Sequence, residues 1–395
     1  MVPKSLLSPN ANSLAAAIES SSIRRNPRMR VLHVFLGPLK PSGGEVMIRA
    51  AAPHFRALGV DCEILDCGQR GVGPYAAAMK DAGYPVHHIP FNRTPSFFLA
   101  FHALVRKGKY DIVHLHSEAA EVFVAASVAS LVPIVRTIHN NFTLTGWMGL
   151  RQRFARALSR FLGVRHLAIG PSVQSTEWKY LWSPTRLCLN WYDSDHFRPP
   201  SSTEREQARR AFGLTESEYA IVSVGNCSSV KNHAVVVEAM SLLQARSNLI
   251  YLHAGLEDSE HTERQLSSSL GQDRRVRFLG GISDVRTLLF ASDLFVMPSL
   301  FEGLPISLLE AMGCALPALV ADTIGLRDLQ EYFPELPLCE PTAGGVARGL
   351  ETLMDEPSGC TQSRAQEWSQ LALAHFGVVA GTRRYFEVYR SVVRP

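Results

Sequence analysis

Short apolar runs that read as buried strands alternate with helical stretches along most of this chain of 395 residues. A second alternation begins at residue 219 and continues to residue 338. Strands separated by helices form parallel sheets, because each crossover returns the chain in the same direction. The sequence therefore predicts an α/β protein with doubly wound parallel sheets. In the first half, strands are expected at residues 30–36, 61–65, 86–89, 111–115, 134–138, 166–169 and 185–189.

A polar segment with Pro199 and Pro200 separates the two alternations and is a candidate hinge. We expect a flexible leader at 1–29, rich in Ser, Ala and Arg, an N-terminal domain at 30–190 and the hinge at 191–202. A C-terminal domain at 203–376 and a last helix at 377–395 follow. Two such domains bind a ligand in the cleft where the carboxyl ends of their strands face each other.

Composition limits the class of protein. No apolar run reaches the ~20 residues that a membrane-spanning helix needs, and the N-terminus lacks the apolar core of a secretory signal. Seven cysteines are scattered, without a C-x-x-C motif or a Cys/His cluster at metal spacing. These features favour a cytoplasmic protein with reduced thiols.

Positive charge is concentrated in one stretch of the first half. No Asp or Glu occurs between Glu121 and Glu177, and from Leu150 to Leu162 apolar residues recur at helical spacing with arginines between them. Such a helix can lie on an anionic membrane surface, or it can pack its apolar face on its own domain. Nucleic acid is not expected as a partner, because aromatic residues that would stack on bases are not interleaved with the charges.

Residues 294–321 form the most informative unit, a predicted strand, loop, helix and strand. The first strand covers 294–298, the helix runs from Ile306 to about Met312 and stops at Gly313, and the second strand covers 317–321. Pro305 is placed in the first turn of the helix, where its missing N–H has no partner to lose. A βαβ unit binds ligands at the carboxyl end of its strand and the amino end of its helix.

Two glutamates frame that edge, Glu302 in the loop and Glu310 in the helix. At about 1.5 Å per residue they are separated by roughly 12 Å, which is too long for a paired-carboxylate hydrolase site. The N–H groups of Gly303, Leu304 and Ile306, together with the helix dipole, favour an anion between the two carboxylates. This spacing suits the two ends of an extended ligand.

The string F-E-G-L-P-I-S-L-L-E-A-M-G, from residue 301 to 313, resembles the E-x7-E signature of retaining glycosyltransferases of the GT-B fold, family 4. The resemblance implies two Rossmann-like domains that face a central cleft. It also implies metal-independent transfer of a sugar, without a cofactor, from a nucleotide-diphosphate sugar to a glycan or lipid-linked acceptor. Polysaccharide synthesis at the inner face of the membrane fits the family and the basic helix.

Other loops match the family at single positions. Gly43 and Gly44 follow the first strand and match its glycine-rich loop, although a simple tight turn gives the same pattern. Lys231 stands where the family holds the diphosphate, but Asn226 replaces the usual arginine. His139 follows the strand at 134–138, where the family often has a histidine near the transferred sugar.

The resemblance then implies a role for each of these groups. Glu310 accepts hydrogen bonds from the ribose hydroxyls of the donor, and Glu302 contacts hydroxyls of the transferred sugar. The diphosphate lies against Lys231 and the glycine loop. His139 faces the anomeric side of the sugar. The backbone of Gly303, Leu304 and Pro305 completes the predicted donor site, to which Asn226 contributes hydrogen bonds.

Two other patterns suggest metal ligands. His114 and His116 have a suitable spacing, but no third ligand is evident, and ordinary hydrogen-bonded histidines explain them equally. Asp193 and Asp195 spell D-x-D, the metal motif of another glycosyltransferase fold. We reject this interpretation because the pair falls in the hinge, where Asp195 is expected to cap or turn the chain. No metal site is therefore predicted.

Two alternative functions remain open at this point. A sugar-nucleotide epimerase can use a similar two-domain fold, although the context of the two glutamates belongs to transferases. A non-catalytic sugar-nucleotide-binding relative is suggested by Asn226, because a missing cation weakens the stabilisation of a leaving diphosphate.

Overall fold

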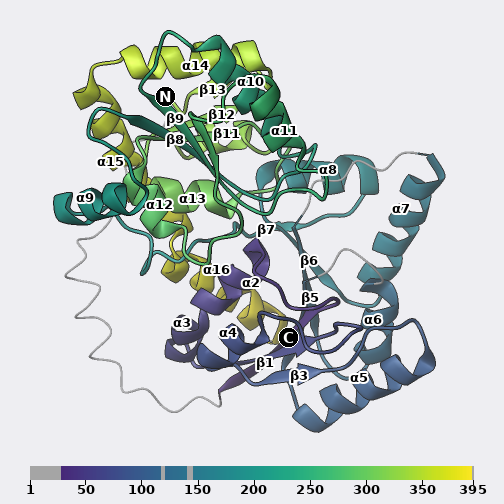
Figure 1. Ribbon diagram of the computed structural model, residues 1–395. Coiled ribbons are helices and arrows are strands. Elements are labelled where there is room, and N and C mark those ends of the chain that lie inside the picture. Colours follow the sequence, from purple (N-terminus) through teal and green to yellow (C-terminus); the bar gives the residue numbers. More distant parts are fainter. Residues whose placement is uncertain (1–27, 117–120, 140–145, 394–395) are drawn as a thin grey trace, which may run out of the picture.

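The computed structural model describes residues 28–116, 121–139 and 146–393, which form two sheets, each with helices on both faces (Figure 1). The first sheet has seven strands in the order β3-β2-β1-β4-β5-β6-β7, and every pairing between neighbours is parallel. Its strands are β1 (Met29–Phe35), β2 (Val60–Asp66), β3 (Val86–His88), β4 (Ile112–Leu115), β5 (Ile134–Ile138), β6 (Arg165–Ala168) and β7 (Arg186–Leu187). The connecting helices are α2 (Gly43–Ala50), α3 (Ala52–Ala57), α4 (Ala76–Asp81), α5 (Pro95–Gly108), α6 (Glu121–Val128), α7 (Gly146–Phe161) and α8 (Pro171–Leu181).

The second sheet has six parallel strands in the order β10-β9-β8-β11-β12-β13. Its strands are β8 (Tyr219–Val224), β9 (Leu249–Ala254), β10 (Val276–Phe278), β11 (Leu294–Met297), β12 (Ala318–Ala321) and β13 (Leu338–Cys339). The helices are α9 (Ser202–Ala211), α10 (Ala234–Leu242), α11 (Thr262–Ser269), α12 (Arg286–Ala291), α13 (Ile306–Gly313), α14 (Ala343–Asp355), α15 (Ser358–Phe376) and α16 (Val378–Val393), with a 3₁₀ turn η1 (Arg327–Glu331). The predicted fold class, two doubly wound parallel sheets, is confirmed.

In both sheets the strand that comes first in the chain is an interior strand. β1 is flanked by β2 and β4, and β8 is flanked by β9 and β11. The crossovers on the two sides of such a strand diverge, which opens a crevice at the carboxyl ends of the strands. The loops after β1, β5, β8 and β11 therefore end at the edges where a ligand is expected.

The expected hinge is packed rather than loose. Trp191 is fully buried and donates its indole N–H to the Met47 carbonyl of α2 over 3.0 Å. Tyr192 lies against Gly313, where an added Cβ would approach the tyrosine ring to 2.5 Å. These two large side chains thus fill the junction between the domains. The end of the expected hinge is regular, because Ser201 caps α9 in a capping box with Glu204.

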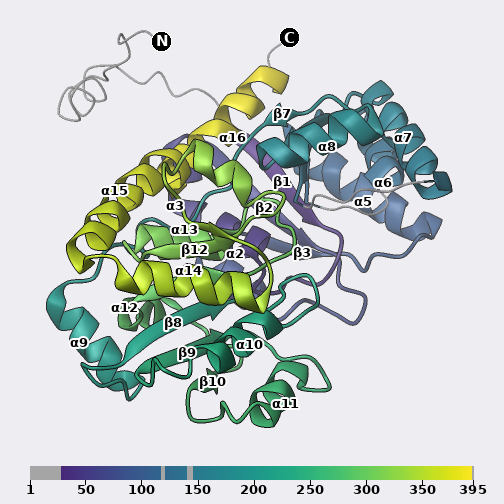
Figure 2. The same cartoon turned by 90° about the horizontal axis from the view of Figure 1, so that it is seen from above.

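The last helix, α16, runs from the second domain back to the first sheet, as Figures 1 and 2 show. Tyr385 and Tyr389 are buried in the core of the first domain. Tyr389 Oη lies 2.7 Å from His114 Nδ1, and Tyr385 Oη lies 2.9 Å from Thr137 Oγ1. Because each buried hydroxyl needs its partner, these hydrogen bonds determine which face of α16 packs against the first sheet.

Most of the expected leader, residues 1–27, lies outside the described residues. The last expected strand of the first sheet is shorter than predicted, since only Arg186–Leu187 pair with β6. Cys188 and Leu189 directly beyond it are buried, and the Cys188 N–H still donates to the Ala168 carbonyl of β6 over 2.8 Å. No helix in the described parts of the chain is both long enough and apolar enough to cross a membrane.

Candidate functional site

The loop between β11 and α13 brings the two domains into contact. A Cβ on Gly303 would lie 2.7 Å from the His139 carbonyl oxygen and 2.8 Å from Ile169 Cδ1, so only glycine fits there. Asn190 Nδ2 donates to the Leu304 carbonyl over 3.3 Å. Pro305 is the N-cap of α13, one residue before the predicted first-turn position, because its ψ of 117° is extended. The amino end of α13 therefore opens directly at the domain interface.

Lys231 and Glu302 form an ion pair at this interface. The Lys231 Nζ atom lies 2.7 Å from Glu302 Oε1, and both side chains are half-buried. The lysine stem also passes over Gly225, since a Cβ there would be 3.8 Å from Lys231 Cδ and Cε. The sequence predicted that Lys231 binds the diphosphate of the donor and that Glu302 binds its sugar. The structure places these two side chains, from different loops, in contact.

The glycine loop of the first domain faces the same place. A Cβ on Gly43 would lie 3.2 Å from Ile306 Cδ1, and a Cβ on Gly44 would lie 3.6 Å from His139 Cε1. α2 begins at Gly43, so its amino end meets the amino end of α13 across the interface. Both ends carry partial positive charge, which favours an anion between them.

Asn226 is exposed and braces a neighbouring loop. Its Oδ1 accepts a hydrogen bond from the Leu256 backbone N–H at 2.9 Å, which ties the loop after β8 to the loop after β9. The amide oxygen is thereby used within the protein, and Nδ2 is the atom of this side chain that can donate to a phosphate. A guanidinium at this position would lack the acceptor that this brace needs.

Glu310 is buried in the second half of α13. Burial first, and then the charges of Asp193 and Asp284, raise the pKa of the Glu310 carboxyl from 4.5 to about 8. At neutral pH the carboxyl is therefore mostly protonated, so that it both donates and accepts hydrogen bonds.

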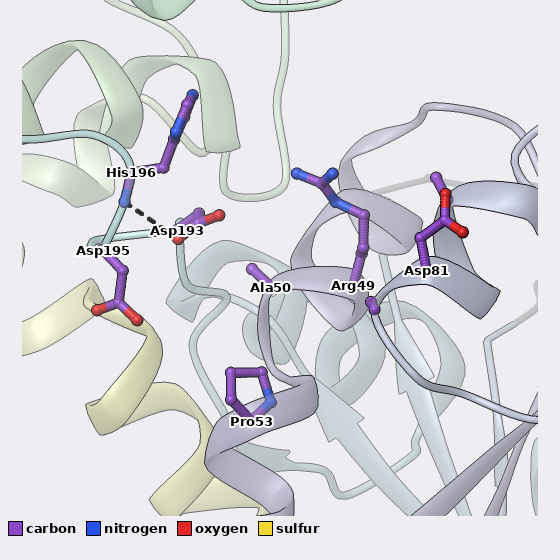
Figure 3. Close-up of a pocket in the computed structure, with 9 residues that line it drawn as sticks. Arg49, Ala50, Pro53, Asp81, Asp193, Asp195 and His196 are labelled. Atoms are coloured by element: carbon purple, nitrogen blue, oxygen red, sulfur yellow. Dashed lines mark hydrogen bonds between the residues drawn. The ribbon is translucent and has the colours of Figure 1, made fainter.

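A cavity of about 560 Å³ lies between α2–α4 and the start of the hinge (Figure 3). None of the residues predicted to bind the donor lines it. The two aspartates of the D-x-D string do: Asp193 Oδ1 accepts from the His196 N–H over 3.3 Å, and Asp195 pairs with His54 Nε2 at 3.0 Å. Asp193, rather than the predicted Asp195, therefore turns the chain.

His139 is the end of a hydrogen-bonded line of three histidines from neighbouring strands. His33 Nδ1 lies 2.9 Å from His116 Nε2, and His116 Nδ1 lies 3.2 Å from His139 Nε2. Burial lowers the pKa of His33 to about 3 and lowers the pKa of His116 well below its usual value. Sequence reasoning missed His33, which becomes relevant only because β1 pairs with β4 and places it opposite His114.

Ring nitrogens of His33, His114 and His116 lie within 4.8 Å of one another, a grouping that could hold a metal ion. However, His114 Nδ1 is bonded to Tyr389 Oη and its Nε2 to Thr137 Oγ1 at 2.8 Å. The remaining pair is joined by its own hydrogen bond. The arrangement therefore fits the expectation of ordinary hydrogen-bonded histidines better than a ligand set.

Two family models match the chain in succession. The model for glycosyltransferase family 4 matches residues 41–225, and the model for glycosyl transferases group 1 matches residues 204–369. The chain belongs to the group 1 glycosyltransferases of family 4. The second match contains the Lys231–Glu302 pair and the whole of α13, and the first contains the glycine loop and His139.

Curated relatives share moderate identity with this glycosyltransferase. The putative glycosyltransferase EpsD of Bacillus subtilis is 30% identical over 46% of this chain and 48% of its own length. An Escherichia coli enzyme named UDP-Gal:alpha-D-GlcNAc-diphosphoundecaprenol alpha-1,3-galactosyltransferase is 26% identical over 58% of this chain and 62% of its own. The chain thus spans about half to three fifths of the length of these two relatives.

Solved structures agree with the fold. A glycosyltransferase from Rickettsia africae superposes with a TM-score of 0.80 at 17% identity, over 93% of this chain and all of its own. Anabaena Alr3699/HepE, solved with UDP and glucose, superposes with a TM-score of 0.79 at 19% identity, over 92% of this chain and all of its own. The predicted GT-B architecture is confirmed by these neighbours.

Proposed function

We propose that this glycosyltransferase moves a sugar from a nucleotide-diphosphate sugar to a glycan or lipid-linked acceptor, with retention at the anomeric carbon and without a metal ion. The observation that carries the proposal is the Lys231–Glu302 pair at the amino end of α13, 2.7 Å apart. Lys231 follows β8 and Glu302 follows β11, so the pair lies at the carboxyl ends of two neighbouring strands. In the donor the diphosphate is bonded directly to the sugar, so a cation for the phosphate and a carboxylate for the sugar hydroxyls must also be neighbours.

The diphosphate would lie against positive charge from three sources. Lys231 supplies a full charge, and the amino ends of α2 and α13 supply partial charges from the N–H groups of their first turns. Negative charge grows on the leaving phosphate as the sugar bond breaks, and fixed positive groups stabilise that change most. These groups take the part that a metal ion has in other transferases, which is why we propose a metal-independent reaction.

In the proposed reaction the bond from the anomeric carbon to the phosphate oxygen breaks. The acceptor hydroxyl forms its bond on the same face, and its proton passes to the leaving phosphate. Glu302, held by Lys231, would accept hydrogen bonds from sugar hydroxyls. His139, beside Gly44, would face the anomeric side. Glu310 would accept from the ribose.

The names of relatives support a choice of donor and acceptor to test first. One relative's name specifies UDP-galactose and a diphosphoundecaprenol acceptor, and a structural neighbour was solved with UDP-glucose. We therefore propose a UDP-sugar as donor and a lipid-linked glycan as acceptor, in cell-surface polysaccharide synthesis within the cytoplasm.

Helix α7 supports a place at the inner face of the membrane. It lies at the outer edge of the first domain in both views (Figures 1 and 2). Three of its aromatic side chains are exposed, Trp147 by 78%, Phe154 by 71% and Phe161 by 86%. Its inward face instead carries Arg156, paired with Glu177 over 2.8 Å. Of the two alternatives for this helix, a membrane surface and packing on its own domain, the exposed aromatic side chains support the membrane surface.

Positive charge accompanies the exposed aromatic residues. Arg151 and Arg160 are exposed on α7, and on the neighbouring α8 Trp178 and the C-cap residue Trp182 are each 64% exposed. Arg153 stacks on Trp182, with its guanidinium carbon 4.4 Å from the ring centre. Aromatic side chains enter the lipid interface while arginines bind anionic headgroups. We propose that this surface holds the enzyme on an anionic membrane, where a lipid-linked acceptor resides.

Donor binding is tested by calorimetry with UDP, UDP-glucose and UDP-galactose, with and without EDTA. The expected result is binding that EDTA leaves unchanged and that Lys231→Met weakens about tenfold or more, since a charge-assisted contact contributes about 1.5–3 kcal/mol. Lys107→Met, an exposed lysine on α5, is the matched control. Equal affinity in both variants would refute the assigned phosphate contact.

Transfer is then tested with the donor that binds, and the configuration of the product is read by NMR. An inverted product would refute retention, and conversion of the donor without acceptor would favour an epimerase. If the native protein binds donor without transfer and Asn226→Arg transfers, the chain is the non-catalytic relative. Loss of transfer after removal of metal would refute metal independence.

Membrane binding is tested by co-sedimentation with vesicles of phosphatidylcholine, with and without phosphatidylglycerol. The native enzyme should sediment with the anionic vesicles, and the double variant Phe154→Ser, Phe161→Ser should remain in solution. Leu373→Ser removes another exposed apolar residue, from α15, and should have no effect. Equal sedimentation of the double variant would rule out α7 as the docking surface.

A further inference from the structure

Three histidines form a hydrogen-bonded line from the core of the first domain to the domain interface. His33 lies on β1, His116 directly follows β4 and His139 directly follows β5. The two joining distances are 2.9 Å and 3.2 Å. His33 is fully buried, His116 is buried and His139 is partly exposed, so the line ends where substrate is expected.

The line forces all three rings into the same tautomer. A neutral imidazole has one N–H and one acceptor nitrogen, so His116 donates to one neighbour and accepts from the other. Each of the two bonds joins Nδ1 of one ring to Nε2 of the next. If His116 donates through Nδ1, then His33 also donates through Nδ1 and His139 accepts at Nε2. The opposite direction would place every proton on Nε2.

The inner end of the line selects one direction. His33 Nε2 is buried and has no hydrogen-bond partner. If the protons were on Nε2, this atom would be an N–H donor without an acceptor in the core. With the protons on Nδ1 it is an unprotonated nitrogen, and unpaired buried N–H groups are the rarer case in proteins. The outer proton then resides on His139 Nδ1, which lies 4.0 Å from the position of a Cβ on Gly44.

We propose that His33 and His116 are positioning residues that orient the His139 ring and hold it in the Nδ1–H form. This inference rests on the proposed function, in which His139 contacts the transferred sugar. With its proton on Nδ1 and its Nε2 held by His116, His139 does not act as a base. A ring held at one nitrogen also loses less freedom when substrate binds, which is how a supporting side chain improves a site.

The tautomer is tested by NMR on protein labelled with ¹⁵N at its histidine rings, because the two ring nitrogens differ in shift when protonated. Signals are assigned by single variants, and the exposed His375 serves as a reference for a histidine ring at the protein surface. All three rings should carry the proton on Nδ1 at pH 7. An Nε2–H signal or a cationic ring among them overturns the proposal. So does a shift of the His33, His114 and His116 signals on adding Zn²⁺ that EDTA reverses, which would mean a metal site.

The kinetic test uses the isosteric pair His116→Asn and His116→Asp. The amide of Asn can donate to His139 from near the place of Nδ1, whereas the carboxylate of Asp only accepts and forces the proton onto His139 Nε2. We expect His116→Asn to keep most of kcat and His116→Asp to lower it about 10-fold or more, with little change in the donor KM. Equal kcat in the two variants overturns the direction of the line.

A double-mutant cycle separates positioning from stability. If His116 acts through His139, adding His116→Leu to His139→Ala lowers kcat no further, within about twofold. Multiplied losses would show that His116 acts by another route. His33→Gln, which keeps a donor, should retain more activity than His33→Leu while both bind UDP. Because the NMR signals need no turnover, a protein without transferase activity would refute the proposed function and leave this result readable.

Discussion

The buried carboxyl of Glu310 should make the stability of this glycosyltransferase fall as pH rises. Its side chain is 7% exposed, and burial with two nearby aspartates raises its pKa from 4.5 to about 8. The folded protein therefore keeps a proton that the unfolded chain releases. The contribution of this proton to the free energy of unfolding is fully present below pH 4.5 and is lost as pH rises through about 8.

The size of this effect follows from the two pKa values. Each pKa unit corresponds to about 1.4 kcal/mol, so the complete loss in the free energy of unfolding is about 5 kcal/mol. About 4 kcal/mol of it falls between pH 5 and pH 9, because ionisation in the unfolded chain has begun at the first pH and ionisation in the folded chain is almost complete at the second. No exposed carboxylate gives a change of this size.

The perturbation is Glu310→Gln, which keeps the shape of the side chain and removes its ionisation. Urea unfolding is measured at pH 5, 7 and 9 for the native protein, this variant and Glu351→Gln, an exposed control on α14. Relative to the native protein, Glu310→Gln should gain about 4 kcal/mol from pH 5 to pH 9, and the control should gain nothing. A difference that stays constant with pH would refute the raised pKa and the burial argument behind it.

Donor binding extends the same reasoning. Ribose hydroxyls that donate to Glu310 favour its ionised form, so binding of UDP should release a proton near pH 7. Calorimetry in two buffers of different ionisation enthalpy measures that release. Binding without proton release would contradict the proposed contact between Glu310 and the ribose.

Three further changes have expected outcomes. Gly303→Ala places a methyl group 2.7 Å from the His139 carbonyl oxygen, so it should lower the free energy of unfolding by about 1–3 kcal/mol and reduce kcat. An unchanged melting temperature and an unchanged rate would contradict the close approach of the domains. Tyr389→Phe leaves His114 Nδ1 unpaired in the core and should cost about 1–3 kcal/mol in urea unfolding, whereas a neutral effect would mean that α16 is held by packing alone. Ser201→Ala removes the capping box of α9 and should cost about 1 kcal/mol, a small fall in melting temperature that Ser201→Asp should restore.

Local patterns in the sequence predict much of the fold. The βαβ unit at 294–321 appears as β11, α13 and β12, with α13 beginning at Ile306 as predicted. Such elements follow from apolar periodicity and from Pro and Gly at their ends, which act over a few residues. The family resemblance gave the two-domain fold for the same reason, since its motif lies within one such unit.

The sequence alone also specified which loops carry the candidate site, but not how their side chains meet. Lys231 and Glu302 are 71 residues apart and touch only because β8 and β11 are neighbours in the sheet. His33 joins the line to His139 only because β1 pairs with β4. Strand order depends on the competition among all possible pairings, and no local pattern records its outcome.

Burial was the other property that only the tertiary structure decided. The same helical periodicity fits a helix that packs inward and one that faces outward, and α7 turned its aromatic side chains outward. In the sequence, Glu310 looks like an ordinary helical glutamate. In the folded protein, burial and the charges of two aspartates distant in sequence raise the pKa of its carboxyl. The sequence by itself thus determined the elements and the chemical groups available, because those depend on neighbours along the chain. The contacts, charges and exposure that turn these groups into a site depend on neighbours in space, and these exist only after the chain has folded.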